Sequence, residues 1–421
     1  MIELLRGRRA PACLAHATPW RAGVYAAAFG LVPLLAWLWP LGFAVLVPVM
    51  SVLLLPLWAR PQQAWPVAAL LFALALWGAG ALGWSPALAR VSPDDPETQF
   101  ALKLLIQVAA FGFFAAGAAG LSGTAAHRAM TVLALGLLAL GVVLVVEGAT
   151  TAALYQQLLA AMGEPIRPDL AERNVGKGQF VLALLAWPAL VFLAAERRRL
   201  LPMLVGLLLL CPFLLNELAP LAGLMAGGIA FLLVRWLGPL GARLVGGLLA
   251  AQVLVSPLLV HAAADAGVLG ALARAAPESW RQRLEVWGFA ADRITESPFL
   301  GWGLEASRMF PSVPLHPHNA GLQVWLELGA VGALLFALLW LRVYEAAARI
   351  ARDDRTGAAA CAGAAGAYFT IGALSYGVWQ EWWLASAALV AAACTALIVA
   401  RRRARLADGP AELRHDELTP L

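Results

Sequence analysis

The sequence predicts an all-α integral membrane protein that crosses the bilayer about twelve times. Hydrophobic residues make up 62% of the 421 residues and charged residues only 13%, and the mean hydropathy is strongly positive. A soluble chain of this length cannot bury that much apolar surface. The apolar residues also fall into runs of about 17–25, which is the length of helix that spans a bilayer.

These runs predict a single membrane domain over residues 1–421. We expect about nine spans in 1–262, a large loop in 263–319, about three spans in 320–400, and a cytosolic tail in 401–421. The expected spans lie near 22–38, 41–58, 64–83, 99–121, 129–149, 178–195, 200–217, 219–237, 244–262, 320–341, 358–378 and 384–400.

The arginines indicate the orientation of the chain. With the N-terminus in the cytosol, every short cytosolic connection carries at least one arginine, as the positive-inside rule requires. The basic, proline-broken N-terminal segment then reads as a cytosolic tail rather than a signal peptide. Because these arginines lie at helix ends, the net charge of +5 does not indicate nucleic-acid binding. The arginines assigned inside are Arg6, Arg8, Arg9, Arg21, Arg60, Arg128, Arg197, Arg198, Arg199, Arg235, Arg243, Arg349, Arg352, Arg355, Arg401, Arg402, Arg403 and Arg405.

Four segments then lie outside: 84–98, 150–177, 263–319 and 375–383. The first holds Asp94 and Asp95, which are a candidate for a divalent metal. No matching histidine or carboxylate lies nearby in the sequence, so no metal and no cofactor is expected. The four cysteines all lie outside the large loop, so no disulfide framework is implied. The last segment is rich in tryptophan, and we expect Trp379, Trp382 and Trp383 to form an interfacial belt.

The large loop is predicted to contain an amphipathic helix over 279–294. Apolar residues recur there at three- and four-residue steps, a pattern typical of a helix that lies in the headgroup region. Its paired arginines, Arg281 and Arg283, either solvate the helix and pair with Glu285 or bind an anion. The anion interpretation gains support from Arg173 and Lys177, because topology rules do not ask for cations outside. Arginine presents a planar fork that fits phosphate oxygens.

A histidine-rich string, His316-Pro317-His318-Asn319, stands before the tenth expected span. His318 is either an exposed loop histidine without a functional role, or a proton acceptor and hydrogen-bond partner at the membrane entrance. Glu327 lies inside the following apolar run, where a carboxylate requires a partner. Gly329 and Gly332 on the same helix are expected to allow close packing of a neighbouring span.

These residues resemble the bacterial O-antigen ligase family, within the wider ligase and polymerase superfamily. His318-Asn319, nine residues, then Gly329-Ala330-Val331-Gly332 is similar to its histidine–polar–x9–G-x-x-G signature. Arg283-Leu-Glu-Val-Trp287 and Pro298-Phe-Leu-Gly-Trp-Gly303 resemble its two loop patterns. The resemblance implies a GT-C-like fold with one large periplasmic loop. The chain departs from the family at 216–220, where many relatives carry an arginine, so Arg173 or Lys177 would have to substitute.

The resemblance also implies a reaction at the periplasmic face of the bacterial inner membrane. O-antigen polysaccharide would pass from undecaprenyl diphosphate to a sugar hydroxyl of lipid A–core, by a metal-independent inverting transfer. His318 would be the base or would orient the acceptor. Arg281 and Arg283, with Arg173 and Lys177, would hold the diphosphate, and His316 and Asn319 would support the pocket. The expected partners are these two lipids and membrane lipids, with no nucleic acid, and the protein is expected to be a monomer.

Three other functions remain open from the sequence. The superfamily includes O-antigen polymerases, whose acceptor is another lipid-linked glycan, and protein O-oligosaccharyltransferases. Trp287 stands where the ligase pattern has leucine, which favours neither ligase nor polymerase. A flippase for polyprenyl-linked glycans needs polar residues along its spans. Few occur here, the main ones being Lys103, Gln107, Gln252 and Glu327.

Overall fold

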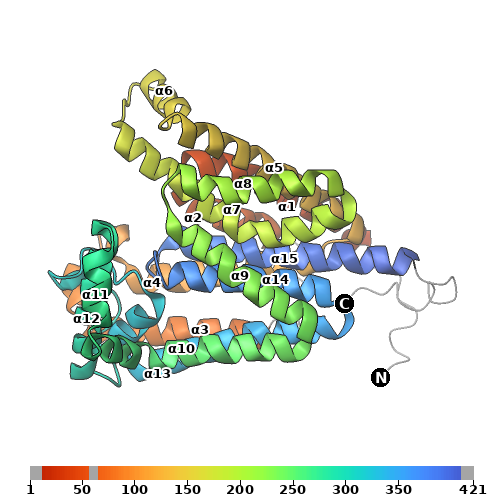
Figure 1. Cartoon of the computed structure of the whole chain (residues 1–421). Helices are drawn as coiled ribbons and strands as arrows, with labels where there is room; N and C mark the ends of the chain where they lie inside the picture. The colour runs from red at the N-terminus through yellow and green to blue at the C-terminus, as the bar shows by residue number, and fades with distance from the viewer. Residues whose placement is uncertain (1–11, 56–64, 409–421) are drawn as a thin grey trace, which may run out of the picture.

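The computed structural model describes residues 12–55 and 65–408, and every regular element in them is helical. The longer helices pack side by side in one bundle (Figure 1). Their bounds are α1 Ala12–Leu38, α2 Phe43–Leu54, α3 Trp65–Ala81, α4 Phe100–Gly117, α5 Gly123–Ala149, α6 Ala153–Ala161, α7 Pro168–Glu196, α8 Leu201–Leu214, α9 Leu218–Leu237, α10 Pro239–Asp265, α11 Val268–Ala275, α12 Glu278–Glu296, α13 Ala320–Asp353, α14 Arg355–Gly372 and α15 Glu381–Asp408.

Every expected span coincides with a helix, but not every helix has the length and composition of a span. Within the described residues, nine helices are long and apolar enough to cross a membrane. These include α13, with 34 residues, and α7, with 29. The helices α2, α8 and α14 stand at expected spans without meeting both conditions. The protein is therefore a multi-pass membrane protein, and the count of twelve stays a prediction.

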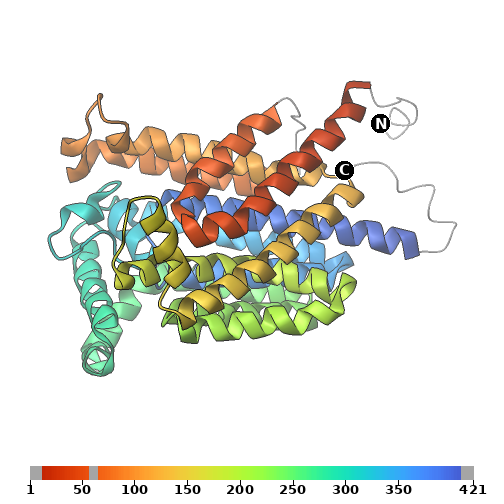
Figure 2. The ribbon, with the colours of Figure 1, turned by 90° about the horizontal axis from the view of Figure 1, so that it is seen from above.

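The helices α11 and α12 lie across one end of the bundle, roughly at right angles to the long helices (Figures 1 and 2). We call this the α12 end. The other end holds the start of α1 and the finish of α15, and we call it the arginine end. The arginines assigned inside from the sequence gather there, except Arg60 and those of 1–11, which lie outside the described residues, as does 409–421. The described members are Arg21, Arg128, Arg197, Arg198, Arg199, Arg235, Arg243, Arg349, Arg352, Arg355, Arg401, Arg402, Arg403 and Arg405.

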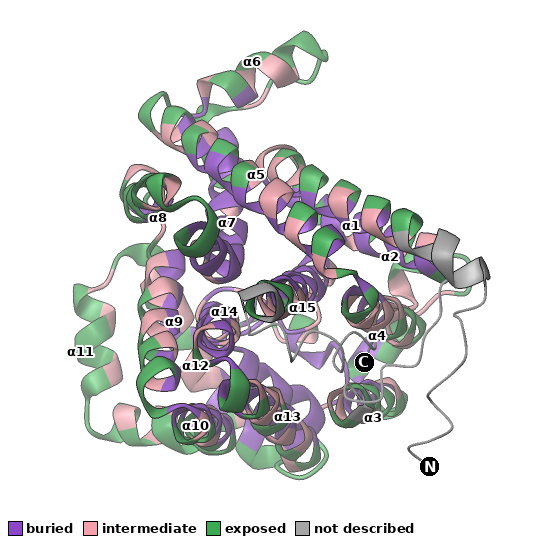
Figure 3. Cartoon of the chain, turned by 90° about the vertical axis from the view of Figure 1, so that its right-hand side faces the viewer, coloured by how far each residue is buried: buried purple, intermediate pink, exposed green. Residues whose placement is uncertain are grey.

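The centre of the bundle is formed by α7, α14 and α15, whose residues are largely buried (Figure 3). The prediction that the tryptophans of 379–383 form an interfacial belt is wrong, because these rings point inward. Trp382 and Trp383 are 4% and 2% exposed, and Trp383 stacks on Tyr368 with ring centroids 4.4 Å apart. Aromatic rings bury a large area and pack well against one another. At this junction of α14 and α15 the rings therefore fill the interior.

Helix α13 is interrupted at Gly329, where φ is +62°. The interruption frees backbone groups, and the turn at 298–303 satisfies them. The N–H groups of Trp302 and Gly303 donate to the carbonyls of Leu326 and Glu327, both at 2.8 Å. On the other side of the break, the N–H of Ala330 donates to the carbonyl of Pro298. The loop that follows α12 is thereby fixed to the backbone of α13, which agrees with the rule that buried backbone groups are paired.

Glycine is required where this turn meets the break. A Cβ on Gly329 would lie 2.2 Å from the carbonyl oxygen of Phe299, and a Cβ on Gly301 would lie 2.5 Å from that of Glu327. The expectation that Gly329 and Gly332 make room for a neighbouring span is therefore wrong. Gly329 accommodates the loop, and a Cβ on Gly332 would meet Leu328 of its own helix at 2.2 Å. A break in the helix replaces the close helix contact that the spacing suggested.

Replacing Gly329 with alanine is expected to destabilise the fold by about 3 kcal/mol or more, because a strained backbone and a steric overlap are combined. Thermal unfolding of the purified protein in detergent measures this. Gly247→Ala is the matched control, since Gly247 lies in α10 with nothing within 4 Å of the added Cβ. That variant should be as stable as the parent or slightly more stable. Equal melting temperatures for the two variants would contradict the role of the break.

Candidate active site

Helix α12 is the amphipathic helix predicted from the sequence, and it brings Arg283 to the bundle. Its buried Ala290 and Ile294 pack against Leu322 and Leu326 of α13. Arg283 is half-buried, with its guanidinium 5.0 Å from the centre of the Trp280 ring. Such a cation over an aromatic face is held by the quadrupole of the ring. The helix therefore presents Arg283 inward, toward the start of α13.

The segment His316-Pro317-His318-Asn319 is fixed at both sides. The indole Nε1–H of Trp287 donates to the carbonyl of Pro317 at 2.8 Å, which ties the segment to α12. The side-chain oxygen of Asn319 accepts the N–H of Leu322 at 3.0 Å and caps α13. Asparagine is among the preferred N-cap residues because it satisfies such a free donor. The capping contact thus accounts for Asn319, for which a supporting role at the pocket was expected.

His318 has a defined tautomer. Its Nδ1 lies 2.7 Å from the carbonyl oxygen of Ser375, which only accepts, so the proton of the neutral ring is on Nδ1. The Nε2 lone pair is left available to accept a proton. Burial lowers the pKa of His318 below its ordinary value of 6.5, and the charges of Arg283 and Arg173 lower it further, while the Ser375 contact acts in the opposite direction. The ring is accordingly neutral at pH 7 and acts as an acceptor.

His316 supports His318 rather than sharing its role. The backbone N–H of His318 donates to Nδ1 of His316 at 3.1 Å, which leaves the proton of the neutral His316 ring on Nε2. That Nε2 lies 3.2 Å from the side-chain amide nitrogen of Gln380, while the amide oxygen of Gln380 is buried without a partner. Amide nitrogen and oxygen are assigned from the hydrogen-bond network, and turning this amide over makes its oxygen the acceptor of the His316 N–H. Burial lowers the pKa of His316 to about 3, with smaller contributions from His318, Arg308 and Arg283. His316 is therefore a weak base that orients its neighbour.

Cations from two parts of the chain, α7 and α12, lie near His318. Arg173 on α7 and Arg283 on α12 both act electrostatically on His318, and also on Glu217 and Tyr376. Lys177 lies one helical turn after Arg173 and donates to the side-chain oxygen of Asn174 at 3.2 Å. Arg173 and Arg283 are thus both near His318 at the α12 end, and Lys177 adjoins Arg173. That these cations bind an anion together stays a prediction.

Arg281 stands apart from this group. It is exposed and forms an ion pair with Glu278 of its own helix. The electrostatic influences on His318 and His316 come from Arg283, Arg173 and Arg308, with no contribution from Arg281. Arg281 therefore has the first of the two roles expected for the paired arginines: it faces solvent and pairs with an acidic residue, which is Glu278 rather than Glu285. Arg283 is placed for the second role, the binding of an anion.

Two ionisable residues of the site were not predicted from the sequence. Glu217 precedes α9, and burial raises its pKa although Arg283 and Arg173 lower it. Tyr376 follows Ser375 between α14 and α15, and burial together with Glu217 raises its pKa well above 10. An acidic residue between two apolar runs was a usable signal for Glu217. Nothing in the sequence distinguishes Tyr376 from the aromatic residues around it.

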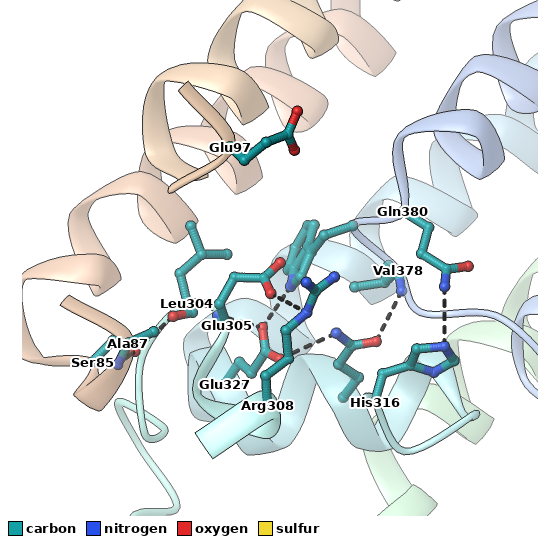
Figure 4. A network of polar contacts seen from close by, with 12 residues as sticks. Ser85, Ala87, Glu97, Leu304, Glu305, Arg308, His316, Glu327, Val378 and Gln380 are labelled. Atoms are coloured by element: carbon teal, nitrogen blue, oxygen red, sulfur yellow. Dashed lines mark hydrogen bonds and ion pairs between the residues drawn. The ribbon is translucent and has the colours of Figure 1, made fainter. Parts of the chain in front are cut away.

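A buried polar network lies beside the histidines and is centred on Glu327 (Figure 4). Its carboxylate accepts the indole N–H of Trp379 at 2.6 Å and the amide of Gln323 at 3.1 Å. The oxygen of Gln323 accepts the N–H of Val378 at 2.9 Å. The partner expected for the Glu327 carboxylate thus comes from the segment between α14 and α15. The same segment supplies Ser375 to His318 and Gln380 to His316, so Glu327 helps to hold both histidines in place.

A second carboxyl group adjoins this network. The backbone N–H of Glu305 donates to Glu327 at 3.1 Å, and its side chain pairs with Arg308 at 2.6 Å. Burial raises the pKa of Glu305, and the nearby Glu327 raises it further. Asp94 and Asp95 take no part, since the Asp95 side chain accepts the N–H of Glu97. Within 12–55 and 65–408, no three histidines, cysteines or carboxylates are grouped as a metal site would require.

Residues 203–337 match a family model described as O-antigen ligase. This part of the chain is therefore similar to the O-antigen ligase family. The matched segment includes α12, the histidine segment and the break at Gly329, which are the features that carried the resemblance in the sequence. Arg173 and Lys177, and the 375–380 segment that contacts both histidines, lie outside it. The candidate site thus also includes parts of the chain before and after the matched residues.

Curated relatives point the same way. A Rickettsia conorii protein named "Putative polysaccharide ligase" is 31% identical over 227 residues, covering 50% of this chain and 54% of its own length. Relatives with the same name in Rickettsia felis and Rickettsia bellii are 30% and 29% identical over the same number of residues, covering 50% of this chain and 55% of their own lengths. The chain thus spans about half the length of the curated relatives it matches.

Removing the charge of Arg283 is expected to raise the pKa of His318, because a nearby cation disfavours the protonated ring. Histidine-selective NMR titration of Arg283→Gln in detergent measures the shift. Arg281→Gln is the matched control, two residues away on the same helix and paired with Glu278. It should leave the titration of His318 unchanged. An equal shift in both variants would show that the overall charge of α12, and not the placement of Arg283, sets this pKa.

Proposed function

We propose that this protein is an O-antigen ligase that transfers O-antigen polysaccharide from undecaprenyl diphosphate to a sugar hydroxyl of lipid A–core. The observation that carries the proposal is the free Nε2 of His318 beside Arg283 and Arg173 at one end of a membrane bundle. A base next to cations is what a hydroxyl acceptor and a diphosphate leaving group need. The match of residues 203–337 to the O-antigen ligase family model supports the reaction class.

The arginine distribution supports a periplasmic active site. Short connections rich in arginine stay on the cytosolic side of a membrane. With the arginine end in the cytosol of a bacterium, the α12 end faces the periplasm across the inner membrane. Nucleotide-sugar donors of the cytosol are then excluded, and a lipid-linked donor is favoured. The expected partners are the two lipid substrates and the surrounding lipids, and a monomer carries every residue of the site.

In the proposed mechanism, Nε2 of His318 accepts the proton of the acceptor hydroxyl as its oxygen attacks the anomeric carbon from the face opposite the leaving group. The bond between the anomeric carbon and the phosphate oxygen breaks, and its electron pair remains on the diphosphate. Arg283, Arg173 and Lys177 stabilise that charge. Inversion follows from this single displacement. Fixed cations are suited to the task because they are already in place when charge develops.

Substitutions test the assigned roles. His318→Ala is expected to lower the transfer rate by about 10²–10⁴-fold through loss of the base. Arg283→Ala should lower it by about 10²–10³-fold through loss of charge stabilisation. Arg281→Ala serves as the comparison and should cost only a few-fold, because that side chain is exposed and already paired. Transfer between purified lipid-linked donor and lipid A–core is the measurement, on variants whose gel-filtration profiles match the parent. Near-parental rates for both His318→Ala and Arg283→Ala would remove the site assignment.

The rate should depend on pH through His318. Its pKa is lowered by burial and by neighbouring cations, so the neutral, proton-accepting ring persists on acidification past 6.5. In a profile of kcat/KM against pH, the acidic limb is therefore expected below pH 6.5. A limb at or above that value would argue against His318 as the base. In the same assay, EDTA should leave the rate unchanged, and loss of activity restored by magnesium or manganese would refute the metal-independent mechanism.

The lipopolysaccharide of a deletion strain separates the alternatives. A ligase defect leaves no O-antigen attached while free lipid-linked polymer accumulates, whereas a polymerase defect leaves a single repeat attached. A protein O-oligosaccharyltransferase would leave lipopolysaccharide intact and remove glycan from proteins. The flippase interpretation is weakened by the interior of the bundle: Lys103 pairs with Glu97 and Glu381, and Glu327 is bonded to Trp379 and Gln323. These polar side chains hold the structure together rather than lining a path.

A further inference from the structure

A basic hollow lies between α10 and α13 at the arginine end. Its volume is about 370 Å³, and its polar walls are Arg243, Arg342, Glu345 and Arg349. Arg342 lies 22 residues after the start of α13, which places the hollow roughly 30 Å from the histidines at 1.5 Å of rise per residue. It is thus separate from the candidate active site and plays no part in the proposed transfer.

The hollow carries an excess of positive charge. Glu345 accepts two hydrogen bonds from Arg243, at 3.0 and 3.2 Å, so this pair is neutral. Arg342 and Arg349 form no ion pair and no hydrogen bond with any described residue, although the charge of Arg349 reaches Glu345. Topology accounts for arginines at this end, but it does not require two unpaired guanidinium groups on the wall of one hollow. Such groups are suited to bidentate binding of an anion.

The surface that leads away from the hollow is apolar. Leu334 and Leu341 of α13 are 51% and 39% exposed, and Leu338 and Leu341 line the hollow. Steps of four and three residues place Leu334, Leu338 and Leu341 in one stripe along α13, on the face that carries Arg342 and Arg349. A free phosphate would use only the arginines. A molecule that has an anionic head and long apolar chains matches both the hollow and the stripe.

We propose that this hollow binds the headgroup of an anionic membrane phospholipid, with its acyl chains along the leucine stripe of α13. The lipid phosphate is held by Arg342 and Arg349, while Arg243 is kept in place by Glu345. Basic pockets between membrane helices on the cytosolic side suit such headgroups, because surface charge and chemical fit act together. The lipid seals the joint between α10 and α13, the helix that also bears Glu327 and the break at Gly329.

Native mass spectrometry of the full chain tests this with phosphatidylglycerol and phosphatidylcholine supplied in equal amounts. The parent should retain one phosphatidylglycerol in preference. In Arg342→Gln/Arg349→Gln, its affinity should fall by about 25-fold, roughly fivefold for each arginine near an anionic lipid. The matched control is Arg198→Gln/Arg199→Gln, which removes two exposed charges from the same end and should retain the lipid. Equal loss in both double variants, or none in either, would overturn the proposal.

A variant that is expected to bind the lipid more tightly provides a second test if the double variant fails to fold. Glu345→Gln releases Arg243 from its partner and adds positive charge to the hollow, so phosphatidylglycerol should bind more tightly. Unchanged or weaker binding would count against the site. Inorganic phosphate at millimolar concentration is the final comparison. If phosphate displaces the lipid when the two are present at equal concentrations, the hollow recognises a simple anion, and the lipid assignment is overturned.

Discussion

The break of α13 at Gly329 determines where the polar groups of the α12 end can meet. A continuous helix would satisfy the carbonyls of Leu326 and Glu327 internally, and the 298–303 turn would have no backbone partner on α13. With the break, this turn docks on the helix, and Glu305 is brought to Glu327. Glu327 in turn holds the 375–380 segment through Trp379 and Gln323. The position of the two histidines follows from these contacts.

The second constraint is electrostatic. Arg173 and Arg283 both affect His318 and Glu217, Lys177 adjoins Arg173, and the charge of Glu217 is disfavoured by burial. A site with surplus cations and a neutral histidine disfavours protonation of that histidine and attracts an anion. Bringing like charges together costs free energy. In the proposed reaction this cost is offset when the diphosphate of the donor binds among these cations.

Much of this architecture follows from local patterns in the sequence. The helix at 279–294, the location of all twelve apolar runs and the one-sided arginines depend on periodicity and composition, which act over short distances. The grouping of Arg173 with Arg283 was inferred from topology, because both lie outside the predicted spans. The contacts of His318 with Ser375 and of Gln380 with His316 bridge residues about sixty positions apart. They depend on how the segment between α14 and α15 packs against the histidine segment before α13, and local sequence patterns do not predict such a contact.

The errors have the same origin. Tryptophans near the end of a span are equally typical of an interfacial belt and of a packed interior, and only the neighbours of Trp382 and Trp383 decide between them. The spacing of Gly329 and Gly332 indicates small residues without stating what approaches them. In both cases the residue type indicated a packing role, but the sequence did not indicate which residue it packs against. The partner came from a segment distant in sequence, the 298–303 turn for Gly329 and Tyr368 for Trp383.

The contact between His318 and Ser375 has a consequence for the biogenesis of the protein. The tautomer of His318 is set by a carbonyl that lies between α14 and α15, and α15 is synthesised after every other described helix. A nascent chain whose α15 has not yet inserted therefore holds the arginines and the histidine, but its Ser375 carbonyl is not yet anchored on both sides. Insertion of α15 is thus the step that fixes this carbonyl against His318, and with it the tautomer of the proposed base.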